Sequence, residues 1–84
     1  MAYTLAQLRP GESGCVAALD FPPQKARRMA DLGFLPGQQV TALHTPPFGG
    51  ITAYQVLDTV IALRDTDASR ITLYTLQDEK DDVL

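Results

Sequence analysis

Residues 31–37, Asp31-Leu32-Gly33-Phe34-Leu35-Pro36-Gly37, carry the signals that decide this fold. The stretch before Gly33, Gln24 to Leu32, is the only one that combines good helix formers with helical spacing of its apolar residues. Gly33 suits the left-handed position that follows a helix, because glycine has no Cβ to oppose a positive φ. Pro36-Gly37 then predicts a turn. The segment therefore predicts a short helix, a defined stop and a new element directly after Gly37.

The chain before this helix contains one expected strand and one expected helical turn. Pro22-Pro23 suits a helix start, since the N–H that proline lacks would be unpaired there. Cys15 to Leu19 is short, apolar and partly β-branched, which predicts a strand. Thr4 to Leu8 predicts one helical turn capped by Thr4. Because a helix over Gln24 to Leu32 is too short to be stable alone, we expect it to pack against the strands.

The chain after Gly37 has the pattern of strands and turns. The expected strands are 38–45, 51–57, 60–64 and 70–76, and residues 65–69 predict a single helical turn before the last of them. Together with Cys15 to Leu19 they make five short strands. The sequence therefore predicts a mainly β fold, a small and strongly bent five-stranded barrel with a short N-terminal helical turn and one helix inserted after the first strand.

Length and charge exclude several classes of protein. The chain has 84 residues, 45% of them hydrophobic, which allows one small domain with a thin core and excludes multi-domain enzymes. The formal net charge is -3. Residues 78–82, Asp-Glu-Lys-Asp-Asp, carry four acids and one base, so that residues 1–77 are neutral. We expect a domain over residues 1–77 and a solvated, disordered acidic tail over residues 78–84.

The sequence also favours a cytoplasmic location. The one cysteine, Cys15, cannot form an internal disulfide, which favours a reducing compartment. The first residues lack the basic and apolar regions of a signal peptide. The longest apolar run, residues 15–19, is far shorter than the roughly 20 residues needed to cross a bilayer. We expect a soluble protein that does not insert into a membrane.

A search of the residue types for catalytic or metal chemistry finds no complete site. The only histidine, His44, falls in phase with the apolar positions of its strand, so we interpret it as a rim residue that packs its ring. With Cys15 it provides one ligand of each type, too few for a structural zinc site within one chain. No Gly-rich phosphate loop occurs. The sequence predicts no enzyme, no metal site within the chain and no cofactor.

Two other classes of function stay open. His44 or surface carboxylates could complete a metal site across two chains, which would make the protein a self-associating, metal-bridged module. The basic cluster Lys25, Arg27 and Arg28 could contact nucleic acid, as small barrels often do, although three charges on one helical turn give only weak, salt-dependent binding. We interpret this cluster first as a solvated helix face, which predicts no nucleic-acid partner.

The Pro46 to Gly50 loop is the first candidate for recognition of another protein. It links two strands and should protrude, because proline cannot donate to a β ladder and glycine permits positive φ. Pro47 would hold the ring of Phe48 outward with little entropy left to lose on binding. We therefore predict a docking patch formed by Pro46, Pro47 and Phe48.

The helix and the residues after it provide the second part of the expected surface. Arg27 and Arg28 would add orientation and association rate to binding more than affinity. Phe34 is expected to lie beside them, on a helical surface over Lys25 to Phe34 that adjoins the loop. Of the two apolar residues after Gly33, Leu35 is the one that we expect in the core.

A longer pattern runs from residue 5 to about residue 76. Its parts, in order, are Leu5-x-x-Leu8-x-Pro10-Gly11, Arg28-Met29-x-Asp31-Leu32-Gly33-Phe34-x-Pro36-Gly37-x-x-Val40, Pro46, Ile61-Ala62-Leu63-Arg64 and Ala68-x-x-Ile71. In this order they resemble the ferrous iron transport protein A (FeoA) family. Its most specific part contains Leu32, Gly33, Pro36 and Gly37. The sequence departs from the family at Asp58-Thr59, where we expect a glycine in the hairpin.

The resemblance implies an SH3-like β-barrel and a cytoplasmic accessory role in bacterial ferrous iron uptake. In that family the small protein is thought to act with the large membrane permease that carries a cytosolic GTP-binding domain, which would bring it to the inner face of the membrane. A related barrel forms the last domain of some metal-dependent transcriptional repressors. This sequence has no DNA-binding helical domain before the barrel, so that role fits poorly.

Overall fold

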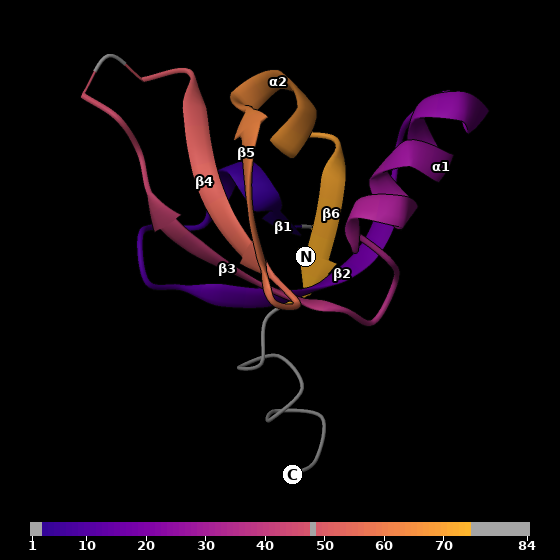
Figure 1. Cartoon of the computed structure of the whole chain (residues 1–84), viewed down its shortest axis with the longest axis horizontal. Helices are drawn as coiled ribbons and strands as arrows, with labels where there is room; N and C mark the ends of the chain where they lie inside the picture. The colour runs from indigo at the N-terminus through magenta and orange to yellow at the C-terminus, as the bar shows by residue number, and fades with distance from the viewer. Residues whose placement is uncertain (1–2, 48, 75–84) are drawn as a thin grey trace, which may run out of the picture.

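The computed structural model describes residues 3–47 and 49–74 of the chain (Figure 1). Short strands alternate with helical segments. In chain order the elements are β1 (Tyr3–Thr4), η1 (Leu5–Gln7), β2 (Ser13–Leu19), α1 (Pro23–Leu32), β3 (Gln39–His44), β4 (Ile51–Val56), β5 (Thr59–Arg64), α2 (Asp65–Ala68) and β6 (Ile71–Tyr74). In these described residues no helix has the length and apolar character needed to span a membrane.

The strands form one antiparallel sheet in the order β1-β6-β2-β3-β4-β5. Register shifts between Val16 and Ala18 and between Ala42 and His44 mark bulges, which bend β2 and β3. The bent strands curl the sheet around the core, as Figure 1 shows. The prediction of a small, mainly β barrel-like fold is confirmed, and the two-residue β1 adds a sixth strand.

The expected elements occur with small shifts at their ends. The strand expected from Cys15 begins at Ser13, because Ser13 and Gly14 pair with Thr41 and Val40 of β3. The helix after this strand, the turn before the last strand and the N-terminal helical turn are all present. The expected last strand is described only as far as Tyr74, so that its residues 75–76 and the tail over 78–84 lie outside the described part of the chain.

The helix α1 ends as residues 31–37 predict. Gly33 has φ 114° and donates its N–H to the carbonyl of Ala30 at 3.0 Å, while Phe34 donates its N–H to the carbonyl of Met29 at 3.0 Å. These are the two bonds of a Schellman motif, in which a left-handed residue turns the chain back over the last helical turn. Phe34 and Met29, the pair whose side chains meet in such a motif, are both buried.

The core contains Phe34 and leaves Leu35 at the surface, so our expectation for Leu35 is wrong. Phe34 is 0% exposed, whereas Leu35 is 49% exposed. The Schellman motif turns Phe34 inward over the helix, and the next side chain then faces the other way. Phe34 joins a buried cluster whose largest members include Leu5, Val16, Val40, Tyr54, Val56, Ile71 and Leu73.

The connection between β4 and β5 contains a leucine in an unfavourable backbone conformation. Val56 pairs with Thr59, which leaves Leu57 and Asp58 as a two-residue connection. Leu57 has φ 55°, a left-handed value that costs a residue with a side chain about 1–2 kcal/mol. The expected connection at Asp58-Thr59 is therefore wrong by one residue, because Thr59 already pairs with Val56, and Leu57 takes a conformation that glycine would adopt without strain.

Candidate interaction surfaces

The two parts of the expected docking surface lie on opposite sides of the molecule. The β3–β4 loop projects at one end of the view in Figure 1 and α1 lies at the other. The expectation that the helix adjoins the loop is wrong, because β3 and β4 carry the loop away from α1. Pro46 is half-buried and Pro47 is exposed, while Phe48 lies outside the described residues. The loop and the helix must therefore be considered as separate surfaces.

The helical part of the expected surface keeps its arginines and loses its aromatic residue. Arg27 and Arg28 are exposed on α1, where a partner could reach them. Phe34 cannot contact a partner in this conformation, because its side chain is fully buried in the core. The sequence misplaced this residue because an apolar residue after a helix stop can face either side. The backbone bonds around Gly33 decide the direction.

Three leucines with exposed side chains lie around the contact between the end of α1 and the β4–β5 connection. Leu32 is 40% exposed, Leu35 is 49% exposed and Leu57 is 60% exposed. Gly33 lies between the first two in sequence, and a Cβ added to it would come within 3.2 Å of Leu57 Cδ1, so the β4–β5 connection lies against the end of α1. We call Leu32, Leu35 and Leu57 the hairpin patch. The sequence pattern placed Leu57 at the end of the expected strand 51–57, so it gave no sign that this side chain lies at a turn.

A groove of about 770 Å³ runs beside α1. Residues of α1 line it from one side, and Arg64 at the end of β5 and Asp67 in α2 line it from the other. Its apolar part includes Met29, which is buried, and Leu32 of the hairpin patch. Lys25 and Arg28 add two positive charges from the helix. The groove thus combines an apolar floor with a mostly cationic rim.

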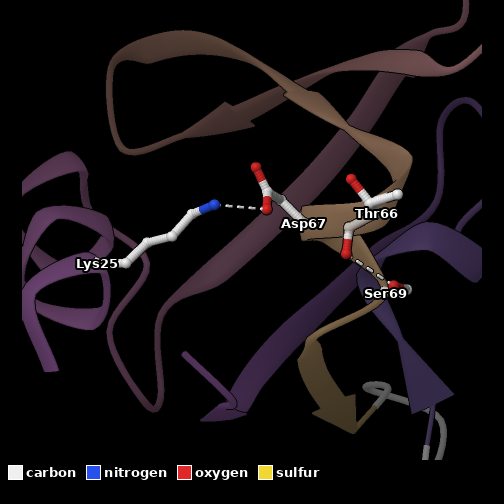
Figure 2. A network of polar contacts seen from close by, with 4 residues as sticks. All are labelled: Lys25, Thr66, Asp67 and Ser69. Carbon is white, nitrogen blue, oxygen red and sulfur yellow. Dashed lines mark hydrogen bonds and ion pairs between the residues drawn. The ribbon is translucent and has the colours of Figure 1, made fainter. Parts of the chain in front are cut away.

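One ion pair ties the two sides of this groove together. Figure 2 shows the Lys25 ammonium reaching from α1 to the carboxylate of Asp67 in α2, with Nζ 2.8 Å from Oδ1. The Lys25 Nζ also lies 5.5 Å from the centre of the Phe21 ring. Figure 2 also shows a hydrogen bond at the end of α2, where the Ser69 hydroxyl donates to the carbonyl of Thr66 at 2.9 Å. Lys25 is therefore already neutralised by Asp67.

The two arginines of the groove have no such partner. Over residues 3–47 and 49–74 the Lys25–Asp67 pair is the only salt bridge, so neither Arg28 nor Arg64 is paired with a carboxylate there. Both residues are exposed. Guanidinium groups bind carboxylates with two parallel hydrogen bonds, which makes them suited to an acidic ligand. The groove can therefore bind further carboxylates through these two arginines.

His44 and the polar residues near it form no metal centre in the described structure. His44 is exposed, which corrects the expectation that its ring packs on the rim; the bulge between Ala42 and His44 breaks the alternation on which that expectation relied. Nearby, the hydroxyl of Thr52 lies 3.1 Å from that of Thr45 and donates to Asp65 Oδ1 at 3.5 Å. No group of three His, Cys, Asp or Glu side chains gathers within the described ranges.

Among the residues that the structure describes, the one titratable group with a clear shift of its pKa has a structural role. Burial raises the pKa of the Tyr54 phenol above its ordinary value, and its hydroxyl donates to the carbonyl of Leu5 at 3.4 Å. Tyr54 is 1% exposed, so no substrate can reach it. This hydroxyl joins β4 to the N-terminal turn.

The whole described chain matches one family. A family model described as the FeoA domain matches residues 3–74. The chain belongs to the FeoA family. This FeoA protein is thereby associated with ferrous iron transport. Among curated protein sequences no match is found.

Solved FeoA structures have the same fold. The solution structure of the FeoA protein from Chlorobium tepidum is 26% identical and has a TM-score of 0.82, over 88% of this chain and 70% of that chain. The crystal structure of Stenotrophomonas maltophilia FeoA, complexed with zinc, is 32% identical with a TM-score of 0.73, over 84% of this chain and 88% of that chain. The second protein is described as a prokaryotic SH3 domain protein. The SH3-like fold expected from the sequence is confirmed.

The same barrel occurs inside larger proteins. A manganese-dependent transcriptional repressor is 24% identical with a TM-score of 0.76, and the match covers 88% of this chain but 41% of that chain. At this identity the likeness shows the fold alone.

Proposed function

We propose that this FeoA protein is a cytoplasmic accessory protein of bacterial ferrous iron uptake, which acts by binding the cytosolic GTP-binding domain of the membrane iron permease. The observation that carries the proposal is the family match over residues 3–74. The exposed apolar side chains of the described structure support a role in protein recognition. Binding to the permease would hold the protein at the inner face of the membrane.

The hairpin patch and the arginines of α1 are the contact surface that we propose. Leu32, Leu35 and Leu57 supply apolar area at the end of the helix, and Arg27 and Arg28 lie on the same helix. Apolar side chains that become fully desolvated dominate the energy of interfaces, while charges at the rim steer association. The loop with Pro46, Pro47 and Phe48 is a second, separate contact in this proposal.

The direct test measures binding of this protein to the purified cytosolic domain of the permease, together with the rate of GTP hydrolysis by that domain. We expect a complex that forms in the absence of membrane. A change in hydrolysis rate on addition of the protein would show regulation of the GTPase, and an unchanged rate within a stable complex would show a role in assembly or gating. Absence of any complex with the domain contradicts the proposal.

Variants then locate the contact. Leu57→Ser and Leu35→Ser should weaken the complex, since both side chains are largely exposed and their loss leaves the core intact. Pro47→Ala and Phe48→Ala test the loop in the same way. Ala6→Ser on η1, exposed and distant in sequence from both surfaces, is the matched control and should bind like the unmodified protein. If only the loop variants lose binding, the assignment to the hairpin patch is wrong while the proposed function stands.

A further inference from the structure

The groove beside α1 has the chemistry of a site for an acidic peptide. Arg28 lines it from the helix and Arg64 from the end of β5, so that two guanidinium groups with no carboxylate partner among the described residues face the groove from its two sides. Lys25, the third cation, is held by Asp67 at 2.8 Å. An occupant that carries two or more carboxylates would satisfy both arginines. Apolar side chains next to those carboxylates would cover Met29 and Leu32.

The sequence of this chain contains a segment with that composition. Residues 78–82 read Asp-Glu-Lys-Asp-Asp and are followed by Val83 and Leu84. The basic groove and this acidic segment are opposite in charge, while residues 1–77, groove included, are neutral as a whole. The segment is also covalently attached to the barrel, so its effective concentration near the groove is higher than that of a separate acidic peptide.

The point where the chain leaves the barrel allows the segment to reach the groove. Tyr74, the last described residue, pairs with Cys15. The next residue of β2, Val16, accepts a hydrogen bond from the N–H of Gly37, just after the end of α1. The chain therefore leaves the barrel at the end of the molecule where α1 stops and where Leu32 begins the groove.

The lengths are compatible. Residues 75–82 can span roughly 26–29 Å when extended, at about 3.3–3.6 Å per residue. The helix itself is about 15 Å long, at about 1.5 Å per residue. A segment that starts after Tyr74, with β2 between it and Gly37, is thus long enough to pass Leu32 and bring its acids alongside Arg28 and Arg64.

We propose that residues 78–82 bind in the groove of their own chain, with their carboxylates paired to Arg28 and Arg64. Exposed ion pairs are screened by salt, so the contact is weak and reversible at physiological ionic strength. The bound segment covers the side of α1 that carries Arg28. The proposal concerns the protein alone and does not rest on the proposed function.

The test compares backbone amide NMR spectra of the full chain and of a chain that ends at Gln77. At low ionic strength we expect the signals of Arg28, Leu32 and Arg64 to differ between the two proteins, while those of the buried Val16 and Val40 coincide. The differences should disappear in salt near 1 M, where the Debye length is about 3 Å. Coinciding signals at Arg28, Leu32 and Arg64 at low salt overturn the proposal.

Charge variants make the test specific. In the double variant Arg28→Glu/Arg64→Glu the full-length and shortened chains should give the same spectrum around the groove. Arg27→Glu, on the same helix but outside the groove, is the matched control and should keep the difference. Adding Asp81→Lys and Asp82→Lys to the double variant should restore the spectral difference between the full-length and shortened chains. If this rescue fails and Arg27→Glu also removes the difference, net charge alone explains the spectral difference, and the proposal is overturned.

Protein concentration separates the two possible sources of the segment. Binding within one chain predicts signal positions that do not change with dilution. Signals that move toward those of the shortened chain on dilution would show that the segment comes from a second copy, and the proposal of an intramolecular contact would then be wrong.

Discussion

Two chain reversals of this protein lie against each other, and each contains a residue with a left-handed backbone conformation. The physical reasons differ between the two. Gly33 ends α1 with φ 114°, and Leu57 turns between β4 and β5 with φ 55°. A Cβ at Gly33 would meet Val56 Cγ2 at 3.1 Å and Leu57 Cδ1 at 3.2 Å, so both conformation and space favour glycine there. Leu57 is 60% exposed, so only conformation opposes its side chain.

The difference between Gly33 and Leu57 distinguishes a residue that serves stability from one that serves recognition. Around Gly33 the backbone bonds, the lack of a Cβ and the buried Phe34 all agree, which is the pattern of a position selected for folding. At Leu57 a residue keeps a large apolar side chain in water at a conformational cost of about 1–2 kcal/mol. Backbone strain that is not needed for packing points to a role at the surface.

The largest expected effect is that of Phe34→Ala. Removing a fully buried phenylalanine should lower the free energy of unfolding by about 3–5 kcal/mol, through lost transfer energy and the cavity left behind. Chemical denaturation monitored by circular dichroism measures it. A loss below about 1 kcal/mol would mean that the Schellman motif does not hold Phe34 in the core.

Gly33→Ala should have the next largest effect. The new side chain must adopt a left-handed conformation and crowd the methyl groups of Val56 and Leu57, which together should cost about 1–3 kcal/mol. The same denaturation experiment applies. The double variant Gly33→Ala/Leu57→Ala relieves part of the crowding, so it should lose less stability than the sum of its two single variants.

Leu57→Gly should change stability in the opposite direction and weaken recognition. Glycine removes the left-handed strain, so we expect the free energy of unfolding to stay equal or to rise by up to about 1 kcal/mol. Affinity for the permease domain should fall, because the most exposed member of the hairpin patch is lost. A stability loss of more than about 1 kcal/mol would show that the leucine is kept for its packing on Gly33.

The same contrast explains how much the sequence could predict. The end of α1 was predictable from Asp31-Leu32-Gly33 and Pro36-Gly37, since glycine and proline limit the backbone directly. The five strands were predictable from alternation and from their bounding turns, whereas their order in the sheet was not. The two-residue β1 was missed because two residues carry no periodic pattern.

The site was less predictable because it depends on contacts between distant segments. Nothing near Leu57 in the sequence indicates that it lies against Gly33, and nothing near Arg64 indicates that it faces Arg28 across a groove. The opposite burial of Phe34 and Leu35 depends on two backbone hydrogen bonds, which composition does not encode. Apolar residues beside a turn can thus be listed from the sequence, but their directions cannot.

Leu35→Ala is the most sensitive test of that last point, because its expected effect is the smallest. Leu35 is 49% exposed and outside the buried cluster, so stability should change by less than about 0.5 kcal/mol, although the adjacent Phe34→Ala costs several times more. The affinity for the permease domain should nevertheless decrease, since Leu35 belongs to the hairpin patch. Denaturation and binding measured on the same preparation separate the two effects. A large loss of stability would place Leu35 in the core after all. Unchanged stability with unchanged affinity would instead remove Leu35 from the contact surface and leave Leu57 as the residue that defines the patch.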